Sequence, residues 1–184
     1  MRLEGTAPDG AGVNEQKVNK EGQALAFSVT QSELEHESEE NGAAYVWATN
    51  SLDLDVGETF LLVKNTSDKP LHIECVKIAN GAAATQFRIH LPTTNVTVVA
   101  GSGGAVVTGT NLNTASSNVA DASAATDETG NSLGDTVRTL FLAINAERSE
   151  PTPGLLLGKN KSIAVDCITE PGTAAVSIIG HYED

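Results

Sequence analysis

Short runs in which apolar and polar residues alternate recur along most of this chain. In residues 85–91, Phe87, Ile89 and Leu91 alternate with more polar side chains, and several other runs repeat the pattern. Because successive side chains of a β-strand point to opposite faces, a period of two is typical of a strand buried on one face. Turn-forming residues separate the runs, and no run has the period of a capped amphipathic helix. About eight to ten such strands predict an all-β, antiparallel β-sandwich.

One run changes its phase part of the way along. In residues 71–80, Leu71, Ile73 and Cys75 fall on one face of a strand, and the apolar phase then continues from Val76. A shift of one residue predicts a β-bulge near Cys75, because an extra residue moves the following side chains to the opposite face.

Two further segments carry local expectations. The last two runs flank Pro171 and Gly172, a pair that favours a tight turn, so they are expected to form a hairpin. Residues 118–129 are rich in alanine and are the best helix candidate, but they lack a large apolar stripe. A helix is therefore not expected there.

The sequence divides into a polar arm and one domain. Residues 1–21 are polar and contain glycine without a sustained period, which predicts an extended or flexible N-terminal arm that can order on a partner. Residues 22–184 are then expected to form a single sandwich domain. Within it, residues 101–134 are rich in small and polar residues and nearly lack large apolar ones. Loops this long are uncommon in compact domains, and we expect this one to lie against another protein.

The charge of the chain excludes two classes of partner. The formal net charge is −13 and the isoelectric point is about 4.6. So acidic a chain repels phosphate backbones and anionic lipid, and neither nucleic acid nor a membrane is expected as a partner. No apolar run reaches the roughly 18–20 residues of a transmembrane helix. The N-terminal segment lacks the pattern of a secretory leader, so synthesis in the cytoplasm is expected.

Patterns that carry catalysis are missing from the sequence. It contains no nucleophile elbow, zinc-protease motif or Walker loop. The GSGG run at residues 101–104 leads into a strand-like segment, whereas a phosphate cradle opens a helix. Paired acids such as Asp53 and Asp55 suit glycoside chemistry, but aromatic residues form only 4% of the chain, which argues against a sugar-binding cleft. No catalytic or cofactor-binding residue is expected.

Metal sites are not predicted either. Residues 33–40 contain five glutamates and are expected to be a solvated turn; a calcium site is the alternative, but the D-x-D-x-D-G spacing is absent. The four histidines, His36, His72, His90 and His181, lie in different segments. Three of them alternate with apolar neighbours in strands, so outward, solvated side chains are expected.

The two cysteines, Cys75 and Cys167, lie in apolar runs and have no nearby metal-binding partner. Buried free thiols are expected for both, and a disulfide is the alternative.

Several stretches resemble a known class of virion proteins. They are LHIECVKIAN, TQFRIHLP, VVTGTNLNTASSNVADASA and the C-terminal GKNKSIAVDCITEPGTAAVSIIGHYE. They resemble structural proteins of tailed bacteriophages with a jelly-roll-like β-sandwich, including the decoration or cement proteins of the capsid. The resemblance covers residues 42–184. It implies an antiparallel jelly-roll-like sandwich, a homotrimer, docking on the major capsid protein or another virion protein, and no catalysis or cofactor.

With this resemblance, the chain is expected to be a capsid decoration protein of the virion, with an extended N-terminal arm along neighbouring subunits. The alternatives are a tail, neck or fibre protein, or a glycan-binding β-sandwich module. The candidate contacts between subunits come from the arm and from the start of the long loop: Val13, Val18, Thr110, Asn111, Leu112 and Asn113.

Overall fold

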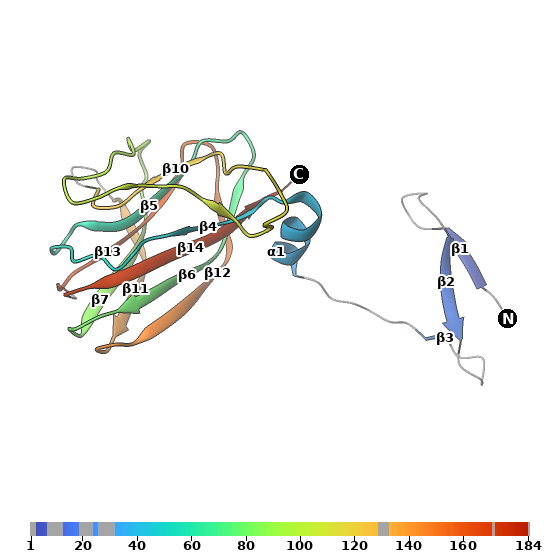
Figure 1. Ribbon diagram of the computed structural model, residues 1–184, viewed down its shortest axis with the longest axis horizontal. Helices are drawn as coiled ribbons and strands as arrows, with labels where there is room; N and C mark the ends of the chain where they lie inside the picture. The colour runs from blue at the N-terminus through green and yellow to red at the C-terminus, as the bar shows by residue number, and fades with distance from the viewer. Residues whose placement is uncertain are drawn as a thin grey trace. The chain divides into compact units, whose positions relative to one another are not determined.

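The computed structural model divides the chain into two compact units, Met1–Ser32 and Glu33–Asp184. They are drawn in Figure 1. The structure describes residues 3–6, 13–18, 24–25, 32–128, 133–170 and 172–183.

The N-terminal unit holds a small antiparallel sheet. Its strands, in order across the sheet, are β1 (Leu3–Thr6), β2 (Val13–Val18) and β3 (Ala24–Leu25). The segment expected to be an extended or flexible arm, residues 1–21, therefore contributes two strands that pair with each other.

The boundary between the units differs from the one expected after residue 21. The run that begins at residue 22 has the alternation of a sandwich strand, but its first part pairs with β2 through Ala24 and Val18. Phe27 and Val29, the other apolar residues of that run, lie outside the described residues.

Two antiparallel sheets pack together in residues 33–184, which confirms the all-β sandwich (Figure 1). The strands of the six-stranded sheet are, in order, β11 (Asp135–Leu142), β7 (Thr85–Leu91), β13 (Ser162–Cys167), β5 (Thr59–Asn65), β10 (Ala122–Ala125) and β8 (Val106–Val107). Those of the five-stranded sheet are β12 (Glu147–Leu157), β6 (Leu71–Asn80), β14 (Ala174–Tyr182), β4 (Ala44–Ala48) and β9 (Thr110–Asn111).

The longer strands pair in a nested order. Leaving aside β8, β9 and β10, the first strand of the sandwich pairs with the last, β4 with β14, and the second with the seventh, β5 with β13. The third pairs with the sixth, β6 with β12, and the two middle strands, β7 and β11, pair with each other. The chain is thus a long antiparallel ribbon folded over into two sheets.

This order overturns the expected C-terminal hairpin. β13 lies in the six-stranded sheet between β5 and β7, and β14 lies in the five-stranded sheet between β4 and β6. Because both strands already have a neighbour on each side, the segment around Gly172 carries the chain from one sheet to the other.

The facing sides of the two sheets hold the core. Trp47, Phe60 and Phe87 are fully buried, and the rings of Phe60 and Phe87 meet edge to face with centroids 5.7 Å apart. Phe87 and Ile89 face inward, as the alternation predicts. Each such side chain contributes about 1.5–3 kcal/mol when it is removed from water.

The segment expected to be a long loop, residues 101–134, contains three short strands. β10 pairs with β5 on one side and β8 on the other, and β9 pairs with β4. Ala124 and Ala125 are buried in β10. A Cβ atom at Gly109 would lie 2.7 Å from Nε1 of Trp47. Many of the small residues of this segment are therefore explained by close packing on the chain's own sandwich.

The glutamate-rich segment, expected to be a turn, is helical. It forms α1 (Glu33–His36) and a π-helical turn, η1 (Glu37–Asn41), which ends at Gly42 in the left-handed conformation. No helix of the described residues is long and apolar enough to cross a membrane.

The β-bulge predicted near Cys75 is confirmed. On β14, Ile179 pairs with Cys75 and Gly180 pairs with Ile73, so Glu74 is the extra residue of β6.

Candidate functional site

The candidate contact residues of the long segment lie at the edge of the five-stranded sheet. Asn111 on β9 donates from Nδ2 to the carbonyl of Gly42 at 2.7 Å and to that of Asn118 at 3.1 Å. Asn113 donates weakly to the carbonyl of Glu39 at 3.4 Å, and its backbone N–H donates to Oδ1 of Asn111. These two amides hold the segment to its own chain.

The other four candidates fall in two places. Thr110 on β9 and Leu112 just after it are exposed and can be reached by a partner. Val13 and Val18 are the end residues of β2 in the N-terminal unit, and their side chains lie outside the described residues.

A surface that the sequence analysis did not single out lies on the opposite edges of the two sheets. β11 ends the six-stranded sheet and β12 ends the five-stranded sheet, so both are edge strands. We call the surface between them the β11–β12 groove. Two hollows line it, of about 600 and 460 Å³, and both are bounded by Arg138, Glu150 and Pro151.

An ion-pair bridge divides this groove. Glu150 on β12 is only 5% exposed, and its Oε1 lies 2.6 Å from Nη2 of Arg138 on β11. Arg148 donates to the other oxygen from Nε at 3.1 Å and Nη2 at 3.0 Å. The bridge therefore joins the edges of the two sheets, and it offsets the desolvation of a buried carboxylate.

The groove also exposes large apolar side chains. Phe141 is 75% exposed and Val137 is 50% exposed, both on β11. The signal in the sequence was the position of Phe141 between Leu140 and Leu142, because an apolar residue in that phase faces away from the core. The contact between Arg138 and Glu150 had no such signal, since it depends on how two strands meet.

A second polar network lies on the outer face of the six-stranded sheet. Arg88 donates from Nε to Oδ1 of Asp166 at 2.9 Å and from Nη2 to Oδ2. Nε2 of His90 lies 3.0 Å from Oδ1 of Asp166, and Nδ1 of His90 lies 3.3 Å from the hydroxyl of Thr136. Burial alone would raise the pKa of Asp166, but the hydrogen bonds with His90 and Arg88 outweigh it and hold the pKa below its ordinary value.

The solvated position expected for His90 is wrong. Its side chain is buried, because the outer face of this sheet is itself covered in part. Val96 packs there against Leu62 and Ala164 in a second, smaller apolar cluster.

The row of Thr136, His90 and Asp166 has the order of a hydrolase triad, but its arrangement favours a structural role. The Arg88 guanidinium already neutralises the carboxylate that would have to stabilise a charged imidazole. The imidazole is buried, with only 5% of its side chain exposed, so a substrate has little access to it.

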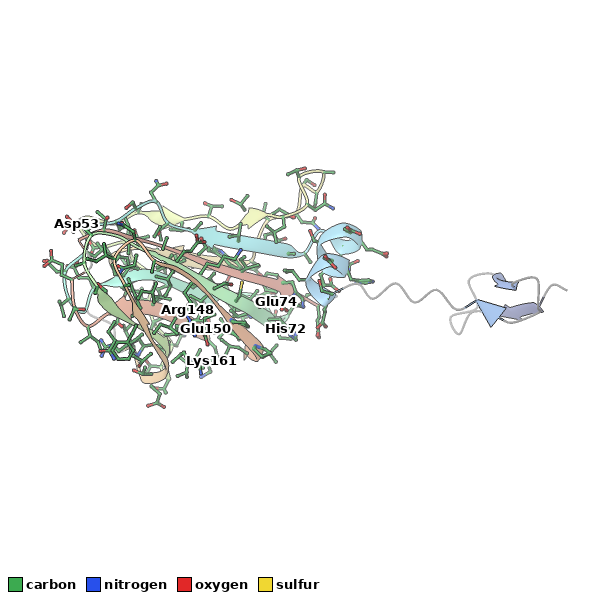
Figure 2. All side chains as sticks on the ribbon, turned by 90° about the horizontal axis from the view of Figure 1, so that it is seen from below. Asp53, His72, Glu74, Arg148, Glu150 and Lys161 are labelled. Atoms are coloured by element: carbon green, nitrogen blue, oxygen red, sulfur yellow. The ribbon has the colours of Figure 1, made fainter. Side chains whose placement is uncertain are left out.

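Two more histidines meet at one end of the sandwich. The rings of His72 and His181 are stacked, with centroids 4.9 Å apart and planes 12° from parallel. Glu74, the residue in the bulge, brings Oε1 within 3.2 Å of Nδ1 of His181, and Figure 2 labels Glu74 and His72 near the end that carries α1. His181 is fully buried, which corrects the expected solvated position, and His72 is half-buried. His36 is exposed, with 52% of its side chain accessible.

Among the described residues, neither His90 nor the pair of His72 and His181 belongs to a group that suits a metal ion. In the part of the chain that the structure describes, no three His, Cys, Asp or Glu side chains are grouped so as to hold one.

The cysteines are free thiols, as expected, and the alternative disulfide is wrong. Cys167 is buried, and burial raises the pKa of its thiol to about 11. The buried position expected for Cys75 is wrong, because this residue is only half-buried next to the bulge of β6.

The GSGG run at residues 101–104 already binds a carboxylate of its own chain. The backbone N–H of Gly103 donates to Oδ2 of the buried Asp127 at 2.7 Å, and the N–H of Gly104 donates to the carbonyl of Gly101 at 3.1 Å. An amide that a phosphate would need is therefore already paired.

Comparison with known proteins adds no relative: no protein-family model, curated protein or solved structure matches the chain.

Proposed function

We propose that this chain is a non-enzymatic structural protein of a bacteriophage particle, a decoration protein that binds the outer capsid surface and stabilises it. The observation that carries the proposal is the nested strand order of the sandwich. An eight-stranded, two-sheet jelly roll is an architecture of viral capsid proteins, and also of lectin domains and cupins.

The strand order supports a jelly roll in detail. Numbered along the chain without β8, β9 and β10, the strands of the five-stranded sheet fall in the order 6-3-8-1, and those of the six-stranded sheet in the order 5-4-7-2. This is the order produced when a ribbon of four antiparallel pairs, 1-8, 2-7, 3-6 and 4-5, wraps into two sheets. The additional short strands extend both sheets on the side of β4 and β5.

The two other uses of a jelly roll fit this chain less well. A lectin stacks exposed aromatic rings on sugars, but among the described aromatic side chains only Phe141 is exposed. A cupin holds a metal between its sheets, whereas the space between these sheets is filled by side chains such as Trp47, Phe60 and Phe87. A structural role therefore has more support than sugar binding or catalysis.

The assembly that we propose is a homotrimer on the virion, in contact with the major capsid protein. Two features support it. The N-terminal unit is compact by itself, which suits a segment that binds a neighbouring subunit. The sandwich also presents exposed apolar side chains in the groove between β11 and β12, and exposed apolar patches mark protein interfaces. A place on the tail, neck or fibre is the competing proposal.

Co-sedimentation with capsids tests the proposal. Particles of the virus that encodes the chain are prepared without it, and the purified chain is added. We expect the full chain to sediment with the capsids at saturating stoichiometry, and a variant without residues 1–32 to bind more weakly with an unchanged thermal unfolding temperature. A full chain that stays in the supernatant would contradict capsid binding, and equal binding by the truncated variant would remove the role of the N-terminal unit.

A further inference from the structure

The two edge strands of the β11–β12 groove differ in how they are protected. β12 contains Pro151 and Pro153, which cannot donate a backbone hydrogen bond and so discourage pairing with another strand. β11 contains neither proline nor glycine in its eight residues, DTVRTLFL, and it pairs only with β7 among the described strands. One long edge of the six-stranded sheet is therefore unpaired, and a bulge at Val137 is its one interruption among the described residues of the strand.

The exposed side chains on this edge are apolar and charged, and they include two arginines as well as the carboxylates of Asp135 and Glu147. Val137 and Phe141 are exposed, and the side chains of Arg138 and Arg148 are 56% and 48% exposed. Figure 2 labels Arg148 and Glu150 on the sandwich. A guanidinium has five N–H donors, and among the described residues the side chains of both arginines bond to Glu150 alone. Both therefore keep donors for another carboxylate.

The opposite edge of the same two sheets has complementary properties. β8 ends the six-stranded sheet with Val106, which is 78% exposed, and Leu112 is exposed just after β9. The helical segment next to β9 presents Glu33 and Glu40 to solvent. The amide of Asn118 bonds to the carbonyl of Asn41 and ties this acidic segment to the β9 edge.

We propose that the β11–β12 groove of one copy binds the β8–β9 edge of a second copy. The six-stranded sheets of the two copies then continue each other, with apolar side chains in contact where they join. The arginines of one copy face the glutamates of the next. Because two different surfaces meet, the contact is heterologous, and a rotation that closes it gives a ring. The choice of a second copy as the partner rests on the proposed homotrimer. The groove and the β8–β9 edge are then the surfaces through which the three copies bind one another.

The experiment uses sedimentation of the full-length chain in solution. A groove variant, V137S/F141S, removes exposed apolar groups from β11, and an edge variant, V106S/L112S, removes them from the other side. We expect the wild-type chain to associate. Each variant alone should associate with a dissociation constant at least tenfold higher. Val56 is exposed in the turn before β5, so Val56→Ser is the matched control, and its assembly should have the same mass as that of the wild type.

Mixing the two variants separates this contact from other arrangements. The groove variant keeps an intact β8–β9 edge and the edge variant keeps an intact groove, so an equimolar mixture forms a one-to-one dimer and no larger ring. A wild-type chain that is monomeric at all concentrations overturns the inference. So does an edge variant that still associates, because that result means groove-to-groove pairing. Neither outcome bears on whether a monomer binds capsids, which the co-sedimentation experiment measures separately.

Discussion

At the scale of single residues, Asp166 shows how much depends on a buried charge that has partners. Its side chain is 2% exposed and lies between Arg88 and His90. Replacing it by Asn leaves the guanidinium without its counter-charge, and we expect the free energy of unfolding to fall by about 3 kcal/mol. Urea unfolding of D166N measures this change. Asp68, whose side chain is 89% exposed beside Lys159, gives the control. D68N should leave the urea midpoint unchanged, and an equal loss in both variants would contradict the role of burial.

The same residue gives the stability a defined pH dependence. The pKa of Asp166 is lowered in the folded chain relative to its ordinary value of 3.8. A carboxyl with a lowered pKa stabilises the folded state at pH values above its unfolded pKa, and this contribution is lost as the pH falls through the folded pKa. The difference in free energy of unfolding between wild type and D166N should therefore be constant from about pH 7 to pH 5, and should shrink below about pH 4. A difference that is unchanged at pH 3 would contradict the lowered pKa.

At the scale of elements, the bulge in β6 depends on a glycine in the strand beside it. A Cβ atom at Gly180 would collide with the backbone carbonyl of His72, which cannot move out of the way as a side chain can. We expect Gly180→Ala to lower the free energy of unfolding by about 1–3 kcal/mol. Gly158 has open space around its Cα, so G158A should change stability by less than about 0.5 kcal/mol. Thermal unfolding of the two variants compares them, and similar melting temperatures would show that the bulge tolerates a side chain.

The elements also show what the alternation of residues could predict. Strands such as β7 were predictable because large apolar side chains alternate along them, and the bulge was predictable from the phase shift at Cys75. β10 was not, because Ala124 and Ala125 are buried by close packing on β5, and alanine gives too weak an apolar signal to mark a face. The prediction of a C-terminal hairpin was wrong for another reason, because a turn sequence does not reveal that the chain passes from one sheet to the other there.

At the scale of the whole molecule, the order of strands in the sheets could not be predicted from the alternation of apolar and polar residues. The pairing between β4 and β14, for example, joins residues more than a hundred positions apart. The groove was hidden for the same reason: Arg138 and Glu150 come together only where the edges of two sheets meet. The candidate contacts at Thr110 and Leu112 lie on an exposed edge, whereas Asn111 and Asn113 hold their own chain together. The surface that we propose for assembly therefore combines a predicted edge with an unpredicted groove.

We propose that this sandwich decorates a capsid, and labelled electron microscopy of intact particles can locate it there. Antibodies raised against residues 33–184 and tagged with gold are added to purified particles of the virus that encodes the chain. We expect gold distributed over the outer surface of the capsid. Gold confined to the tail, neck or fibres, or particles without any gold, would contradict it.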